Sequence, residues 1–273
     1  MAAKSFNSVN DCSNLVTLQN KSRNRMRLSG WYLAIALALL GLSGTTAKAQ
    51  ETWEQRAWGY LFGSSSPDQT RALAPQDITI GLKRTLHLSA EYAAIKLGHY
   101  DGFAKDSSVR IQLPPKFQKA RDLLGHFGLS GRLDDLELQM NRAAENAVPD
   151  ILPAIHHAIE QLSIANPGKI AAGPDDAATA YFSFLSDSDL QRIIRPIIDK
   201  QLQEVGTPHT LAIIDHGLHA LPMAPNLKFD ATAYVSEKTL AGIYQYMARK
   251  EQKIRHRPGA TRDPIIKQLF SDD

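Results

Sequence analysis

The chain has 273 residues, with 31 Lys and Arg against 28 Asp and Glu, so its formal net charge is +3. Only 25 of the basic residues but 27 of the acids follow Ala49. Nucleic acid attracts proteins with a basic excess, which this part of the chain lacks, so no nucleic-acid partner is expected. The single cysteine, Cys12, precedes Ala49, and the rest of the chain offers no thiol for a disulfide or a metal.

The N-terminal region has the layout of a secretory signal peptide. Two arginines precede a 12-residue apolar run, residues 31–42, and small residues around Ala49 follow it. A membrane-spanning helix needs roughly 20 residues, so we predict cleavage after Ala49, export to the periplasm or the medium, and no transmembrane segment in the mature chain. A retained anchor is the alternative. Residues 1–49 then form an N-terminal extension plus signal peptide, with Met26 as a second candidate start.

Residues 50–75 form a segment of their own. An aromatic stretch with Trp53 and Trp58 predicts a short helix, and a Ser- and Pro-rich linker follows it. We favour packing of this helix on the main domain, because so short a segment has only a weakly amphipathic pattern. The alternative is contact with a membrane surface through Trp53 and Trp58, since tryptophan favours interfaces.

Residues 76–273 predict a single compact domain of the all-α class. Apolar residues recur there at spacings of three and four, as on one face of a helix. Alternation at Val109, Ile111 and Leu113 allows at most a very short extended segment near 109–113. The expected helices are 77–97 with Asp77 as its cap, one from Pro115, 133–148 ended by Pro149, 151–162, 174–185, 186–205, 230–255 and a short one from Pro264.

Asn141, Arg142 and Glu145 stand out because the helix around them is rich in alanine. Arg142 and Glu145 are three residues apart, a spacing that allows an ion pair along one helix. The small neighbours let another backbone come close. We therefore interpret the three polar groups as links to adjacent helices, such as those that carry Arg195 or Arg255. A ligand site on this helix is the alternative.

Several motifs occur in the order in which one known family carries them. They are DGF (101–103), IQLPPKFQKA (111–120), LELQMNRAAENAVP (136–149), DDAATAYF (175–182), RPIID (195–199), YVSEKTLAGIY (234–244) and EQKIRHRPGATR (251–262). From about Gly81 to Phe270 the chain resembles the domain of unknown function 4197 family, helical proteins of Gram-negative bacteria that usually carry export signals. The resemblance implies a helical fold and export but no activity. Candidate binding residues in these motifs are Asn141, Arg142, Glu145, Tyr181, Arg195, Glu237 and Arg255.

A histidine-rich stretch, interpreted as a loop over 209–219, offers a second kind of site. His209, Asp215, His216 and His219 lie within it. Zinc takes three or four N, O or S ligands, and two histidines without a placed third ligand rarely suffice. These histidines are also no hallmark of the family, so we predict no metal and no other cofactor.

The expected function is therefore a non-catalytic exported protein that binds an envelope protein or a small amphipathic ligand. The sequence has no G-x-S-x-G elbow, no cysteine nucleophile after residue 49 and no glycine-rich phosphate loop. A hydrolase or metal-dependent enzyme that uses the loop 209–219 stays open as the alternative.

Overall fold

The computed structural model describes residues 73–126, 128, 130–219 and 228–271. These residues fall within one compact unit, 51–273. The predicted cleavage site after Ala49, the alternative start at Met26 and the aromatic segment with Trp53 and Trp58 lie outside the described residues.

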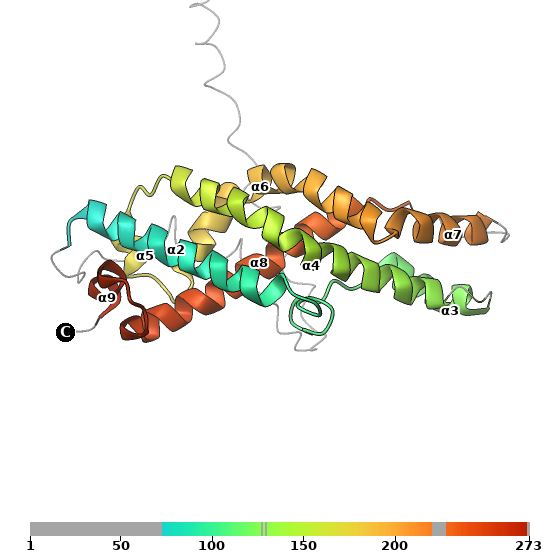
Figure 1. Cartoon of the computed structure of the whole chain (residues 1–273), viewed down its shortest axis with the longest axis horizontal. Helices are drawn as coiled ribbons and strands as arrows, with labels where there is room; N and C mark the ends of the chain where they lie inside the picture. The colour runs from blue at the N-terminus through green and yellow to red at the C-terminus, as the bar shows by residue number, and fades with distance from the viewer. Residues whose placement is uncertain (1–72, 127, 129, 220–227, 272–273) are drawn as a thin grey trace, which may run out of the picture. The chain divides into compact units, whose positions relative to one another are not determined.

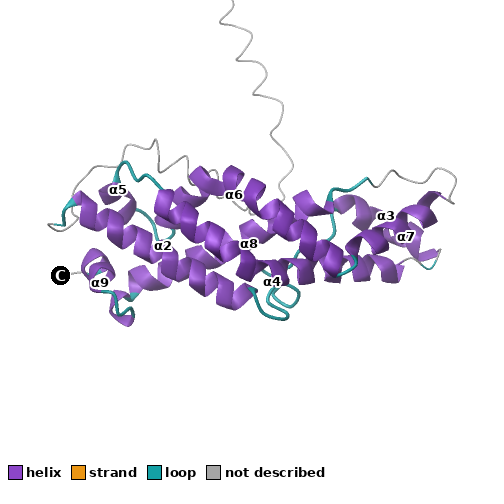
Figure 2. Cartoon of the chain, turned by 45° about the horizontal axis from the view of Figure 1, so that its top comes forward, coloured by secondary structure: helices purple, strands orange, loops and turns teal. Residues whose placement is uncertain are grey.

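The described chain is built of helices, and it contains no strand (Figures 1 and 2). This confirms the predicted all-α class. None of the described helices combines the length and the apolar character needed to cross a membrane. The elements are α2 (Pro75–Leu97), α3 (Pro115–His126), α4 (Ser130–Gln161), α5 (Pro167–Ala171), α6 (Ala177–Glu204), α7 (Thr207–His219), α8 (Ala231–His256), the 3-10 turn η1 (Pro258–Ala260) and α9 (Pro264–Phe270).

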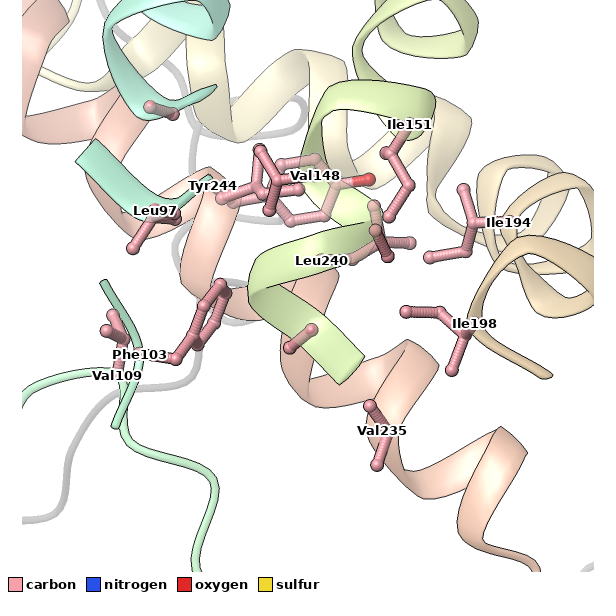
Figure 3. Close-up of a cluster of buried hydrophobic side chains, with 14 of the residues drawn as sticks. Leu97, Phe103, Val109, Val148, Ile151, Ile194, Ile198, Val235, Leu240 and Tyr244 are labelled. Carbon is pink, nitrogen blue, oxygen red and sulfur yellow. The ribbon is translucent and has the colours of Figure 1, made fainter. Parts of the chain in front are cut away.

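The core forms where α2 packs along α8, α4 along α6, and α6 along α8 (Figure 1). Side chains from these helices meet in one continuous cluster, in which Ile151 of α4, Ile194 of α6 and Leu240 of α8 are fully buried (Figure 3). Each such side chain contributes about 1.5–3 kcal/mol relative to its exposed state. Phe103, from the connection between α2 and α3, also enters this cluster (Figure 3).

Two predicted helix boundaries are wrong, because packing overrides local propensity. Helix α4 continues through Pro149 and Pro153, although proline removes a backbone donor and costs about 3 kcal/mol inside a helix. Both prolines are exposed, while Val148 and Ile151 beside them are buried and hold the helix in place. The expected helices 174–185 and 186–205 are one helix, α6, whose buried face passes through Ser186 without a break.

The stretch 209–219 is a helix and not a loop. Gly206 adopts a positive φ of 84°, which ends α6, and α7 begins one residue later. Ile214 and Leu218 are buried at a helical spacing of four, so the segment packs as an amphipathic helix. At the start of α2 the cap position is Ala74, and the predicted cap Asp77 lies within the first turn. The short helix from Pro264 is confirmed, with Asp263 as its cap.

Candidate functional site

Asn141 on α4 holds the extended part of the α2–α3 connection. Its side-chain oxygen accepts the Ile111 N–H at 2.9 Å, and its amide donates to the Ile111 carbonyl at 2.8 Å. A single side chain thus satisfies both backbone groups of Ile111, as a neighbouring strand would do. Val109 and Leu113, on either side of this residue, are buried in the core. The alternation predicted for 109–113 is real, but a helix side chain takes the place of a second strand.

Glu145 and Arg142 bind the other part of the same connection. One Glu145 oxygen accepts the N–H groups of Phe103 and Ala104, both at 2.9 Å, and the other accepts from Arg142 at 2.6 Å. Arg142 also donates to Asp101 at 2.6 Å. Burial disfavours the charge of Arg142, but its bonds to Glu145 and Asp101 outweigh this and raise its pKa. We call these residues, with Asn141, the loop clamp.

The loop clamp confirms the predicted pair of Arg142 and Glu145 and corrects its partner. The polar groups of α4 bind the connection between α2 and α3 rather than the helices that carry Arg195 or Arg255. Asn141, Arg142 and Glu145 each already form at least two hydrogen bonds to backbone or side-chain partners. The arrangement therefore fixes a loop and leaves little free capacity for a ligand.

Glu251 and Arg255 of α8 form a second clamp, at the start of α6. The Glu251 carboxylate accepts the N–H groups of Ala178 and Thr179 at 2.9 and 2.7 Å, and also the Thr179 hydroxyl at 2.7 Å. Arg255 donates to Glu251 at 2.8 Å and to the Ala171 carbonyl at 2.7 Å. Glu251 binds backbone N–H groups that no helical carbonyl satisfies at a helix start. We call this the helix-start clamp.

The other predicted binding residues do not converge on one place. Tyr181 donates to the Ser163 carbonyl at 2.8 Å, and Arg195 pairs with Asp230 at 2.5 Å. Glu237 pairs with its neighbour Lys238 at 2.8 Å. Each of these contacts ties the fold locally.

The histidine-rich segment presents its polar side chains outward on α7. His209, Asp215, His216 and His219 are all exposed, and His219 bonds to the Asp215 carbonyl at 2.8 Å. Within the described part of the chain, no group of three or more His, Cys, Asp or Glu side chains is placed to hold a metal ion.

An open cavity of about 510 Å³ lies among α2, α8 and the connection from η1 to α9. Its lining comes from Arg84, His87 and Leu88 of α2, from Lys250 of α8, and from residues 260–263. Sites for small molecules have volumes of about 300–1,000 Å³. We take this cavity as the candidate functional site, and we call it the cationic cavity.

The cationic cavity exists because α9 returns to α2. A Cβ atom at Gly81 would lie 2.8 Å from Leu269 of α9, so only glycine allows this approach without a shift. Asp263 caps α9 by accepting the N–H groups of Ile265 and Ile266, and it accepts from Arg84 at 2.9 Å. Burial raises the pKa of Asp263, but these hydrogen bonds outweigh it and lower the pKa.

The charge balance of the cavity favours anions. Arg84, Lys250 and Arg262 supply three positive charges, and Asp263 is the only acid in the lining. Asp263 is already engaged by Arg84 and by the start of α9. Among the described residues, neither Lys250 nor Arg262 pairs with a carboxylate. Two positive charges therefore face the cavity without compensation.

His87 connects the cavity wall to α4. Its Nδ1 lies 2.5 Å from Nδ1 of His156, so one nitrogen donates and the other accepts, and the rings share one proton there. Nε2 of His87 lies 2.7 Å from Glu160. Burial and the neighbouring charge of His87 lower the pKa of His156. Both effects favour the neutral form of the His156 ring.

Sequence reasoning missed Arg84, His87, Lys250 and Arg262, which form the cavity, and Glu251 in the helix-start clamp. The run HRPGATRD (256–263) carried the available signal, because it is a basic turn directly before a capped helix. Arg84 and Asp263 are 179 residues apart in the chain, so their meeting needs the tertiary fold.

These features define an all-helical protein with two buried arginine–glutamate clamps and an open cationic cavity. The model of the family described as "Protein of unknown function (DUF4197)" matches residues 72–271. The chain belongs to this family, as its ordered motifs indicated. It matches no curated protein and no solved structure.

Proposed function

We propose that this chain is a non-catalytic binding protein of the cell envelope that holds a small anionic ligand in the cationic cavity. The observation that carries the proposal is the uncompensated positive charge of Lys250 and Arg262 at a cavity of ligand size. A carboxylate or phosphate there would form charge-assisted hydrogen bonds, which are stronger than neutral ones.

The cavity lining also suits an apolar part of the ligand. Leu88 and Ala260 contribute apolar surface beside the cations. An amphipathic anion places its charged head near Arg262 and its apolar part on Leu88. This combination supports the small amphipathic ligand expected from the sequence. The cations of the lining favour a negatively charged head group on that ligand.

The binding test compares octyl phosphate with octyl glucoside, which has the same tail and a neutral head. Calorimetry should show that the wild type binds octyl phosphate more tightly. Lys250→Ala combined with Arg262→Ala should weaken this binding about tenfold, since each exposed charge is worth up to about 1 kcal/mol. The matched control is Arg192→Ala with Lys200→Ala, which removes the same charge from the exposed face of α6. Equal binding by both double variants would contradict the proposal.

The envelope location is supported by the N-terminal pattern and needs its own test. Expression of the full chain with its own leader should yield a periplasmic or secreted protein whose first residue is Gln50. A purified chain that begins at Met1 or Met26 would show that no cleavage takes place. Native mass spectrometry of the exported protein would also reveal an acidic ligand that stays bound.

The enzymatic alternative rests on the residues 209–219. Its candidate ligands His209, Asp215, His216 and His219 are exposed on α7, and no described residue outside that helix joins them in a group that could hold a metal ion. No observation favours catalysis there.

A further inference from the structure

A second group of cations lies beside the cationic cavity, where α2 meets the C-terminal half of α8. The ammonium groups of Lys96, Lys250 and Lys253 lie 5.9, 5.4 and 5.3 Å from the centre of the Tyr92 ring. We call these three lysines with Tyr92 the lysine cluster. Lys250 also lines the cavity, so the two features are continuous.

The contacts within the lysine cluster leave its charge uncompensated. Lys253 donates to the Tyr92 hydroxyl at 3.3 Å. In the described parts of the chain, none of the three lysines pairs with a carboxylate. Cation–π contact with one ring contributes about 0.5–1 kcal/mol at an exposed site, while three like charges around that ring repel one another.

Two acids of this part of the fold, Asp106 and Glu91, interact with other groups. Asp106 accepts from Tyr246, another ring of this surface, and from Ser108, and the charge of Arg249 also acts on it. Glu91 is exposed on α2, and its charge acts on His156, toward α4. The lysines that form ion pairs in the described part of the chain are Lys105, Lys200 and Lys238, so neither carboxylate pairs with a lysine of the cluster.

We propose that the ligand carries several phosphate-type charges and bridges the cationic cavity and the lysine cluster. One anionic group binds at Arg84 and Arg262, and a second binds among Lys96, Lys250 and Lys253. Ammonium groups serve as point charges for phosphate, and Lys250 links the two positions. This inference rests on the proposed function and names the ligand class of the same site. A free polyphosphate and a phosphorylated lipid headgroup share this chemistry.

The first test compares inorganic tripolyphosphate with inorganic phosphate by calorimetry on the exported wild-type protein at low salt. Tripolyphosphate should bind at least about tenfold more tightly, because it reaches both groups of cations. Lys96→Ala combined with Lys253→Ala should remove this preference and leave octyl phosphate binding in the cavity unchanged. Both lysines are exposed, so the variant should keep the wild-type melting temperature. The control Arg192→Ala with Lys200→Ala should keep the preference.

The outcomes separate this inference from the proposed function. If the wild type shows no preference for tripolyphosphate, or if the lysine variant keeps it, the bridging ligand is ruled out. Octyl phosphate binding would still support the cavity in that case. If octyl phosphate does not bind either, the proposed function fails and the inference falls with it.

A second arm identifies the source of the phosphates. Phosphatidylcholine vesicles with phosphatidic acid should sediment the wild type but not the lysine variant if the ligand is a lipid headgroup. Binding of tripolyphosphate without sedimentation assigns the site to a soluble polyphosphate. Both results support a multiply charged phosphate ligand.

Discussion

The loop clamp on α4 and the helix-start clamp on α8 each join an arginine to a buried glutamate of the same helix, and each glutamate accepts two successive backbone N–H groups. They differ in what the arginine binds next. Arg142 takes a second carboxylate, Asp101, and is 17% exposed, whereas Arg255 is 7% exposed and takes backbone carbonyls of residues 170–173. Glu251 is fully buried. The helix-start clamp, which is the less exposed of the two, thus contains a single carboxylate, that of Glu251.

The comparison shows what a buried charge pair does in this fold. Such a pair adds little stability over a well-packed apolar core, yet the loss of one partner is costly. In both clamps the glutamate serves backbone donors that have no other acceptor, so its role is to fix a chain segment. The cost of losing each glutamate should follow its burial and its number of donors.

The largest effect is expected for Glu251→Ala. This change leaves the N–H groups of Ala178 and Thr179 without an acceptor and Arg255 without its carboxylate. The free energy of unfolding should fall by about 3–5 kcal/mol. Urea unfolding at neutral pH measures it.

The matched control for Glu251→Ala is Glu237→Ala on the same helix. Glu237 forms an exposed pair with Lys238, so its loss should change stability by no more than about 0.5 kcal/mol. Similar losses for the two variants would show that the helix-start clamp has no special weight.

An intermediate effect is expected in the loop clamp. Arg142→Ala leaves the Glu145 carboxylate without its ion pair and should cost about 1–3 kcal/mol. The spacing of the two residues in the sequence predicts that adding Glu145→Ala would recover part of this loss, because it removes the unpaired charge. The structure argues otherwise, because Phe103 and Ala104 would lose their acceptor.

Glu145→Gln is therefore the more informative second substitution to combine with Arg142→Ala. The amide oxygen can still accept the two N–H groups, and it brings no unpaired charge. Arg142→Ala with Glu145→Gln should recover part of the lost stability, while Arg142→Ala with Glu145→Ala should recover none. Equal stabilities for the two double variants would show that the backbone bonds contribute little.

The same residues show which features of the structure can be predicted from the sequence. Periodicity predicted most helices and the all-α class, and the spacing of Arg142 and Glu145 predicted their pair, because these are local properties. Pro149 was misread as a helix end because its exposure on a well-packed helix is a tertiary property. Glu251 was missed for the same reason, since a charged residue on a long helix reads as solvent-facing.

The cationic cavity could not be predicted from local patterns in the sequence. It requires α9 to return to α2, where Leu269 lies so close to Gly81 that a larger residue at this position would have to displace the end of the leucine side chain. A lone glycine within a helical pattern gives no hint of such a contact. The site depends on packing between distant segments.

The smallest effect concerns the second carboxylate of the loop clamp. A hydrogen bond from Lys105 and another from Arg142 lower the pKa of Asp101 below its usual 3.8. A lowered pKa means that the ionised form stabilises the fold above the unfolded pKa, and that this contribution disappears as the pH falls through the folded pKa. Asp101→Asn should therefore be less stable than the wild type at neutral pH, and the difference should shrink in acid.

Urea unfolding of the wild type and Asp101→Asn at neutral pH and at about pH 3 measures this difference. Asparagine tolerates the left-handed backbone at this position, where φ is 70°, so the substitution tests the charge and not the turn. A difference that stays constant with pH would assign the effect to packing. The helix-start clamp offers no equivalent group, since Arg255 finds its further contacts in carbonyl oxygens, which do not titrate. Acid sensitivity through a second carboxylate should thus belong to the loop clamp alone.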